Sequence, residues 1–301
     1  MYDLIIIGAG PAGITASVYA ARKSMELLVI SKNIGGQAAS SGEIENYTGY
    51  QFITGPELAA KFEEHLRQYN IILKEGEEVI EVKKKEDVIQ VNTDKGIYEA
   101  KTAIVASGKR PKELGVPGEE KFKNKGLTYC ATCDGPIFSG KDVAVIGGGN
   151  SALDAVLQLI KIANHVYVIN IAANLAGDAV MRQKVQESKI VTILNNSRVV
   201  AILGDKFVNG IKIEKEDKEE IVGVEGIFVE VGLIPNSDFV KDVEKNKVGE
   251  IKVNCYNETS SPGIFAAGDV TDVPEKQIVI AAGEGAKAAL SAFRYLARHK
   301  F

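Results

Sequence analysis

Two glycine-rich turns, each between a short apolar run and a predicted helix, constrain the fold of this chain more than any other feature. The first is Gly8-Ala9-Gly10-Pro11-Ala12-Gly13, and the second is Gly147-Gly148-Gly149-Asn150-Ser151-Ala152. In such turns the first glycine permits the bend, the second lets a pyrophosphate approach the backbone, and a small third residue lets helix and strand pack closely. Two copies predict two dinucleotide-binding halves.

Each turn predicts the start of a parallel βαβ unit. The expected elements are a strand at residues 3–7, a helix to about residue 23 and a strand at 26–31, and then a strand at 143–146, a helix to about 163 and a strand at 166–170. Residues 77–100 and 199–224 alternate in polarity and predict two β-meanders with solvated turns. The expected fold class is therefore α/β, with two Rossmann-like, three-layer domains that each combine a parallel sheet and a β-meander.

The length of the chain and the positions of glycine and proline predict how the two domains are arranged along the sequence. A chain of 301 residues is long enough for two domains. Glycine and proline at residues 115–118 and 232–236 mark two transitions. We therefore predict a discontinuous first domain at residues 1–114 and 235–301, with a second domain inserted at residues 115–234.

Charge and cysteine content disfavour several classes of function. With 36 basic and 40 acidic residues the net charge is -4, and no dense basic stripe is present, so we expect no nucleic-acid partner.

The uncharged stretch at residues 4–21 is interrupted by glycines and a proline, so we expect neither a signal peptide nor a membrane span. Only three cysteines, Cys130, Cys133 and Cys255, favour a reducing, cytoplasmic setting.

The segment Cys130-Ala131-Thr132-Cys133 is the most informative chemical feature. Two thiols at this spacing can close a small disulfide ring, and one of them is often acidic enough to attack another disulfide. A structural zinc site needs four ligands, and the chain has neither a second such pair nor clustered histidines, so we expect no metal. Asp134 either shuttles protons for the thiols or forms a turn. Cys255 has no partner at a suitable spacing and is expected to be a small buried residue.

A third candidate feature is Gly268-Asp269, which ends a short apolar run. Open α/β sheets bind ligands at this end of their strands, where Asp269 can accept a hydrogen bond from a ribitol hydroxyl. A turn or helix-cap role for Asp269 is the alternative. The next helix is expected from about Gln277-Ile278 to Arg298, and its N-terminus can direct N–H groups at an electron-rich ring.

The two glycine turns and the cysteine pair, taken with the further motifs below in their order along the sequence, resemble those of low-molecular-weight thioredoxin reductases. The resemblance covers essentially the whole chain. Gly35-Gly36-Gln37, Ile44-Glu45-Asn46-Tyr47 and Gly268-Asp269-Val270 belong to the same pattern. Residues 232–236 and 277–291 also resemble the reductase part of the alkyl hydroperoxide reductase flavoprotein subunit. That subunit carries an additional N-terminal disulfide-relay domain, so we expect the dithiol partner here to be a separate protein.

The resemblance implies an FAD enzyme that passes electrons from NADH or NADPH to the Cys130/Cys133 disulfide and on to thioredoxin or a glutaredoxin-like protein. It implies that Cys133 lies nearest the flavin, that Cys130 attacks the partner and that Asp134 is acid and base. It also implies a homodimer and a domain motion. The implied FAD residues, in the first domain, are Gly8, Gly10, Pro11, Ala12, Gly13, Ser31, Gly36, Gln37, Asn46, Gly268, Asp269, Gln277 and Ile278. The implied pyridine-nucleotide residues, in the inserted domain, are Gly147, Gly149, Asn150, Ser151, Ala152 and Asn170.

Two alternatives differ from this reductase in class or donor. One is a related flavin disulfide reductase that takes electrons from another donor, such as reduced ferredoxin, and the second glycine turn weighs against it. The other is a flavin-binding protein without disulfide chemistry, and the cysteine pair weighs against it.

The segment after the second nucleotide-binding strand predicts the electron donor. NADPH-dependent thioredoxin reductases have a basic cluster here for the 2′-phosphate, whereas residues 168–177 contain no basic residue. Asn170 stands where NADH users place a carboxylate, and an amide bonds ribose hydroxyls without charge assistance. We predict that NADH reduces the flavin faster, or at lower concentration, than NADPH in stopped-flow measurements. A preference for NADPH would instead indicate that Arg182 or Lys184 folds back to the phosphate, and no reaction with either nucleotide would favour another donor.

Overall fold

The computed structural model describes the chain at residues 1–39, 41, 43–44 and 46–299, and the side chains of residues 43, 132 and 133 lie outside that description. The chain forms two compact units. The first comprises Met1–Arg110 with Ile234–Phe301, and the second, Pro111–Leu233, is inserted into it in sequence. The predicted assignment of one cofactor to each domain stays a prediction.

A mixed sheet forms the centre of the first unit. Its parallel part consists of β1 (Tyr2–Ala9), β2 (Leu27–Ile34), β5 (Ile72–Glu75), β19 (Ile264–Ala266) and most of β8 (Ile97–Val105). The predicted meander is confirmed, because β6 (Val79–Lys85), β7 (Val88–Thr93) and β8 pair antiparallel. Side chains of β1 alternate between two apolar clusters, one on each face of the sheet, and this double burial explains its continuous apolar sequence.

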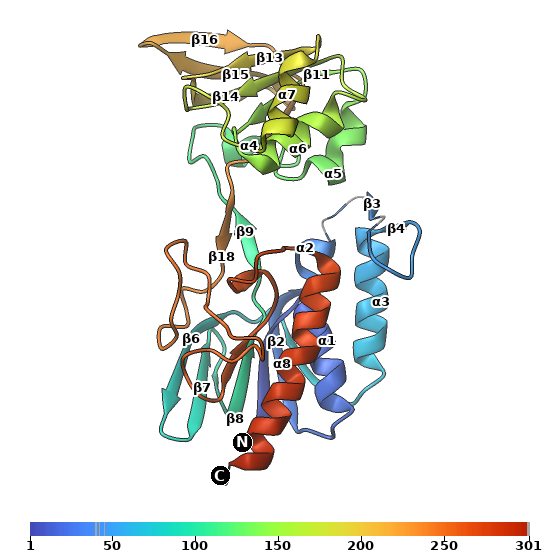
Figure 1. Ribbon diagram of the computed structural model, residues 1–301, viewed down its shortest axis with the longest axis vertical. Helices are drawn as coiled ribbons and strands as arrows, with labels where there is room; N and C mark the ends of the chain where they lie inside the picture. Colours follow the sequence, from blue (N-terminus) through green and yellow to red (C-terminus); the bar gives the residue numbers. More distant parts are fainter. Residues whose placement is uncertain (40, 42, 45, 300–301) are drawn as a thin grey trace. The chain divides into compact units, whose positions relative to one another are not determined.

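Helices α1 (Pro11–Ala21) and α8 (Ile278–Arg298) pack against each other and contribute to one apolar cluster with β1 (Figure 1). The helix α3 (Gly55–Arg67) lies against α1 and begins with a capping box between Thr54 and Glu57. Short elements α2 (Gly36–Ala39), β3 (Glu43–Ile44), β4 (Ile53–Thr54) and the 3-10 helix η2 (Gly268–Val270) complete the unit. The predicted span of α8 is confirmed.

The second unit repeats this plan with a five-stranded parallel sheet. Its strands, in spatial order, are β10 (Leu127–Thr128), β17 (Gly226–Val229), β11 (Asp142–Ile146), β12 (His165–Ile169) and β13 (Val191–Leu194). The second predicted meander is confirmed as β14 (Arg198–Gly204), β15 (Val208–Lys215) and β16 (Lys218–Val222). The helical elements are α4 (Glu119–Phe122), α5 (Ala131–Asp134), the 3-10 helix η1 (Gly135–Phe138), α6 (Asn150–Leu159) and α7 (Ala179–Glu187).

Helix α6 ends four residues earlier than the sequence predicts. Turn hydrogen bonds continue beyond the helix as far as Ala163, whose N–H donates to Leu159 O at 2.8 Å, and the chain then pairs with residues 140–141, where Gly140 N–H donates to Ile162 O and Asn164 N–H donates to Lys141 O. Strands β9 (Lys109–Pro111) and β18 (Leu233–Pro235), which carry the chain between the two units, pair with each other. Within the described part of the chain, no helix has both the length and the apolar character needed to cross a membrane.

Two glycines of α8 differ in their surroundings. A Cβ at Gly285 would stand 2.0 Å from the carbonyl oxygen of Ala12 in α1, whereas a Cβ at the exposed Gly283 would meet nothing within 4 Å. We predict that Gly285→Ala lowers the free energy of unfolding by about 1–3 kcal/mol through overpacking. The matched control Gly283→Ala should raise it by roughly 0.5–1 kcal/mol, because alanine favours the helix. Urea unfolding measures both, and equal effects would contradict the close packing of α1 and α8.

Candidate functional site

The first glycine turn forms a backbone cradle at the start of α1. Gly8 has a φ of +104°, and a Cβ there would stand 2.4 Å from Ala106 O; a Cβ at Gly13 would stand 1.8 Å from Gly8 O. Gly10 is the N-cap of α1, whose first turn has no side-chain cap and no acidic residue. Space beside Gly10 is open, since the nearest atom to a Cβ would be Gly36 Cα at 3.9 Å. This cradle fits a phosphate at the helix N-terminus.

Residues predicted to bind FAD come together from distant parts of the first unit. Asn46 Nδ2 donates to Gln277 Oε1 at 3.0 Å, and these residues are 231 positions apart. Ile278 follows directly as the first residue of α8. A Cβ at Gly268, where φ is +77°, would stand 3.0 Å from Ala12 Cβ. The structure therefore places the N-termini of α1 and α8 and the η2 turn near one another.

Ser31 and Gln37 flank the same turn. The Ser31 hydroxyl is buried, accepts from Ala9 N–H at 3.0 Å and donates to Asn33 O at 2.6 Å. The Gln37 side chain points toward Gly108, with Nε2 4.0 Å from the position of a Cβ there. Ser31 thus supports the cradle from within, and its predicted contact with FAD stays a prediction.

Asp269 is a partly buried acceptor in η2, directly after β19. None of the described residues donates a hydrogen bond to its carboxylate. Burial raises the pKa of Asp269, and the Lys276 and Lys109 ammonium groups lower it. Glu250 forms ion pairs with both lysines, and its Oε1 lies 2.5 Å from Lys109 Nζ and 3.2 Å from Lys276 Nζ. A partly buried acceptor of this kind fits a ribitol hydroxyl, so the first unit has a donor and acceptor set suited to a flavin dinucleotide.

The second glycine turn has the same form. Gly147 has a φ of +139°, and a Cβ there would stand 2.3 Å from Glu230 O. A Cβ at Gly148 would stand 2.4 Å from Asn170 Oδ1. Gly149 is the N-cap of α6, with no side-chain cap, no acidic residue in the first turn and open space where a Cβ would stand. This turn also fits a phosphate group.

The loop after β12 is bonded to the second turn. Ala176 N–H donates to Gly148 O at 2.7 Å, and Asp178 N–H donates to Asn150 Oδ1 at 2.7 Å. A Cβ at Gly177 would stand 2.7 Å from the same Asn150 oxygen. The predicted nucleotide residue Asn150 therefore positions this loop.

Two polar side chains of this region bond within the protein. Asn170 is only 4% exposed, and its Nδ2 donates to Ala172 O at 3.0 Å and to Asn195 Oδ1 at 2.8 Å. Both amide hydrogens are thereby used, which leaves only acceptor capacity on Oδ1 for a ribose. Arg182, the first cation after the strand, folds back onto the loop, with Nη1 3.4 Å from Leu175 O and a buried Nε that has no described partner.

The redox segment is held by a short hydrogen-bond chain. Cys130 is half-buried and disulfide-bonded, and the side chain of Cys133 lies outside the described residues. Cys130 N–H donates to Thr128 Oγ1 at 3.2 Å, and the Thr128 hydroxyl donates to the Asp134 carboxylate. Asp134 N–H donates to Cys130 O at 3.2 Å. Thr128 thus orients both the predicted attacking cysteine and the predicted acid and base.

Sequence reasoning missed Thr128 and Glu230. Glu230 directly follows β17, and the backbone of Ala131 in the redox segment acts to lower the pKa of its carboxyl. Burial, together with the nearby charge of Asp154, raises the pKa of Glu230 to about 7. The available signal was a single charged residue in the otherwise apolar run of residues 226–234.

The prediction that Cys255 is buried is wrong, because its thiol is free and exposed. It lies in a surface turn in which Asn257 N–H donates to Asn254 O at 3.0 Å and Tyr256 N–H donates to Asn254 Oδ1 at 2.9 Å. Asparagine side chains and a left-handed φ of +62° at Asn257, rather than an apolar pattern, determine this turn.

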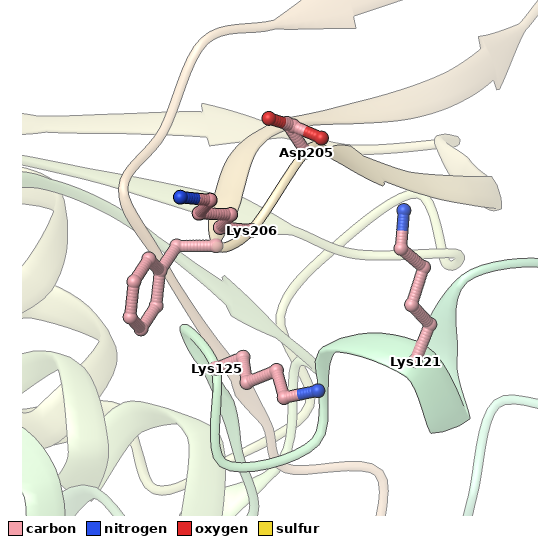
Figure 2. Close-up of a pocket in the computed structure, with 5 residues that line it drawn as sticks. Lys121, Lys125, Asp205 and Lys206 are labelled. Carbon is pink, nitrogen blue, oxygen red and sulfur yellow. The ribbon is translucent and has the colours of Figure 1, made fainter.

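A surface depression elsewhere in the second unit contains none of the predicted site residues. Figure 2 shows its exposed lining residues, Lys121, Lys125, Asp205, Lys206 and Phe207. We assign no role to it. No group of three or more His, Cys, Asp or Glu residues that could hold a metal ion occurs among the residues described.

The chain is similar in sequence to a known protein family and to curated proteins. A family model described as pyridine nucleotide-disulphide oxidoreductase matches residues 2–285. The NADH dehydrogenase of Bacillus subtilis (strain 168) is 43% identical, with 99% of this chain and 59% of that protein covered. A subunit of the alkyl hydroperoxide reductase of Staphylococcus aureus (strain MSSA476) is 41% identical, with 99% and 60% covered. The chain thus spans about three-fifths of the length of these curated relatives.

A solved structure extends the similarity to the fold. The thioredoxin reductase of Lactococcus lactis, in its FR conformation, superposes with a TM-score of 0.82 at 34% identity, covering 99% of this chain and 100% of that one. The α/β fold class and both resemblances inferred from the motifs are therefore confirmed.

The Asp269 environment leads to a prediction about the cofactor. We expect purified protein to be yellow, with about one FAD per chain. Replacing Asp269 by alanine should lower the retained FAD severalfold, because the partly buried acceptor is lost, while the exposed Asp238→Ala serves as control. Absorbance of released flavin measures both. Colourless wild-type protein that cannot be reconstituted with FAD would end this assignment.

Proposed function

Because this chain belongs to the pyridine nucleotide-disulphide oxidoreductase family, we propose that it is an FAD-dependent disulfide reductase that transfers electrons from a pyridine nucleotide to a dithiol protein. The family uses FAD and NAD(P)H. When bound, FAD supplies a two-electron carrier between nucleotide and disulfide. The observation that carries the proposal is the disulfide-bonded Cys130 within a segment that bonds Thr128 and Asp134.

In this proposal Cys130 and Cys133 form the redox pair. Two electrons and two protons convert their disulfide into two thiols, so the segment needs a proton donor. Asp134 serves as acid and base, and the Thr128 hydroxyl holds its carboxylate within the segment. Cys130 then attacks the disulfide of the partner and Cys133 resolves the mixed disulfide.

The two glycine turns support the assignment of the cofactors. In the first unit the turn at Gly8–Gly13, Asn46, Asp269 and Gln277 would bind FAD, and in the second unit the turn at Gly147–Ala152 would bind the pyridine nucleotide. The name of the B. subtilis relative supports NADH as donor. The name of the L. lactis structure supports thioredoxin, or a similar dithiol protein, as partner. A homodimer is part of the same proposal.

One observation favours a donor other than a pyridine nucleotide, such as reduced ferredoxin. The Asn170 amide bonds Ala172 and Asn195 inside the protein instead of presenting its donors to a ribose. A donor of this kind would leave the cysteine chemistry unchanged and make the second unit a scaffold for the redox segment.

Cysteine substitutions test the electron route. Cys130→Ser and Cys133→Ser should each abolish reduction of a thioredoxin-type substrate yet leave flavin bleaching by the donor largely intact, because the thiols act after the flavin. Cys255→Ser removes the exposed free thiol and should change neither measurement. Substrate thiol release and anaerobic flavin absorbance report the two steps. Full substrate reduction by either active-site variant would contradict the proposed relay.

Trapping separates the roles of the two thiols. A substrate that lacks its resolving cysteine should accumulate as a mixed disulfide with Cys133→Ser, which retains the attacking Cys130, and not with Cys130→Ser. Non-reducing gel electrophoresis detects the adduct. The opposite pattern would exchange the two roles.

A further inference from the structure

The residue before Cys130 is bonded to a buried carboxylate. The hydroxyl of Tyr129 donates to Glu119 Oε1 at 2.7 Å, and Glu119 is buried. The same Oε1 accepts Leu114 N–H at 2.8 Å, and Oε2 accepts Gly115 N–H at 2.7 Å. Three donors therefore meet at one carboxylate, and one of them is the side chain that directly precedes the predicted attacking cysteine.

Helix α4 holds this carboxylate in place. Glu119 is the first residue of α4, and Phe122, the last, is buried in an apolar cluster that also contains Leu127 of β10. A buried carboxylate is stable only when hydrogen-bond donors satisfy it, so the three donors and their acceptor fix one another. The acceptor for the Tyr129 hydroxyl thus belongs to a packed element.

The chain around Cys130 is restrained on both faces of the second sheet. Side chains of β11 alternate between two apolar clusters, so these clusters lie on opposite faces. Tyr129 packs against one cluster, and Ala131 belongs to the other. Cys130 lies between these two residues, and its N–H donates to Thr128 Oγ1 at 3.2 Å. These contacts hold the backbone of Cys130 without involving its sulfur.

The Tyr129 hydroxyl is suited to anchor the chain and not to act as an acid. Burial, together with the bond to the Glu119 carboxylate, raises the pKa of Tyr129 well above its usual value. The phenol therefore keeps its proton, and with it the hydrogen bond, at neutral pH. A hydrogen bond to a charged acceptor is stronger than one between neutral groups, so this bond can hold a segment whose covalent link has opened.

We propose, on the basis of the redox role assigned to Cys130, that Tyr129 and Glu119 are a positioning pair that fixes the backbone of Cys130 independently of its disulfide. Reduction opens the covalent ring that joins Cys130 and Cys133, and the Tyr129–Glu119 bond then keeps the Cys130 thiol in place. A fixed thiol has a higher effective concentration toward its partner thiol than a mobile one, which stabilises the disulfide relative to the dithiol.

Tyr129→Phe tests this role, because it removes the hydroxyl and retains the ring. The FAD-loaded full chain is equilibrated anaerobically with reduced and oxidised dithiothreitol, and alkylation with mass spectrometry measures the reduced fraction of Cys130. Each dithiothreitol that closes its own disulfide gives two electrons and two protons to the pair, which becomes two thiols. The variant should be half-reduced at an about three- to tenfold lower ratio of reduced to oxidised dithiothreitol than wild type, a shift of up to about 30 mV.

Tyr167→Phe is the matched control. Tyr167, in β12, packs against the same apolar cluster as Tyr129, and β17 and β11 lie between β12 and β10 in the sheet. Its midpoint should equal that of wild type. A residue that only stabilised the core would lower the free energy of unfolding equally in oxidised and reduced protein and would leave the midpoint unchanged. An unchanged midpoint in Tyr129→Phe would overturn the positioning role, and so would an equal shift with Tyr167→Phe.

Hydrogen exchange in the wild-type protein covers the case in which Tyr129→Phe does not fold. NMR follows exchange of the N–H groups of Cys130, Leu114 and Gly115 in the oxidised protein and after reduction by dithiothreitol. Reduction should accelerate exchange by no more than about threefold at each, because the anchor holds the segment without the disulfide. A larger acceleration at Cys130 would show that the disulfide holds the segment, and it would contradict the proposal.

These measurements distinguish failure of the inference from failure of the proposed function. They use a chemical reductant and require neither an electron donor nor a protein partner. Partner reduction that persists in Cys130→Ser would remove the redox function. An unchanged midpoint in Tyr129→Phe together with loss of partner reduction in Cys130→Ser would remove only the role of the positioning pair.

Discussion

At Gly13 the chain approaches the carbonyl oxygen of Gly8 so closely that a single added carbon would stand 1.8 Å from it. This contact sets how α1 leaves β1, and α1 in turn provides the surface on which α8 packs through Gly285. The position of Gln277, at the N-terminus of α8, follows from that packing. The Gly147 turn plays the same part in the second unit, where it approaches Glu230 rather than a second glycine.

Local patterns sufficed to predict the architecture. Both glycine turns, both meanders and the span of α8 follow from neighbouring residues, because strand and helix periodicities are local properties. That Asn46 and Gln277 serve one site was implied only by family resemblance, and their hydrogen bond was not predicted, since no local pattern links residues 231 positions apart. The inward amide of Asn170, by contrast, depends on the backbone carbonyl of Ala172 in its own loop and on the side chain of Asn195, which follows another strand.

Polar residues next to strand ends carry most of the chemistry assigned to the second unit. Thr128 ends β10, Glu230 follows β17 and Asn170 follows β12. The side chains of Thr128 and Asn170 make hydrogen bonds to the redox segment and to a loop, and Glu230 N–H donates to Ile146 O. Parallel strands bring such positions to one edge of the sheet, so residues remote in sequence act together there. Sequence analysis identified Asn170 at this edge and missed the other two, because a single polar residue in an apolar run also fits an ordinary strand end. Cys255 illustrates the opposite error, because an isolated cysteine was assumed to be buried when its turn residues indicated the surface.

Because the second unit is inserted into the first in sequence, the two parts of the first unit are synthesised at different times. Strand β19 completes the sheet against β8, and α8 covers α1, yet both are synthesised after the whole of Pro111–Leu233. On the ribosome the contiguous second unit can therefore gain its core first, while the N-terminal strands wait for the last part of the chain. Until that part emerges, α1 packs only against β1, β2 and α3, and the apolar surface that α8 later covers stays exposed, which favours aggregation of the nascent polypeptide.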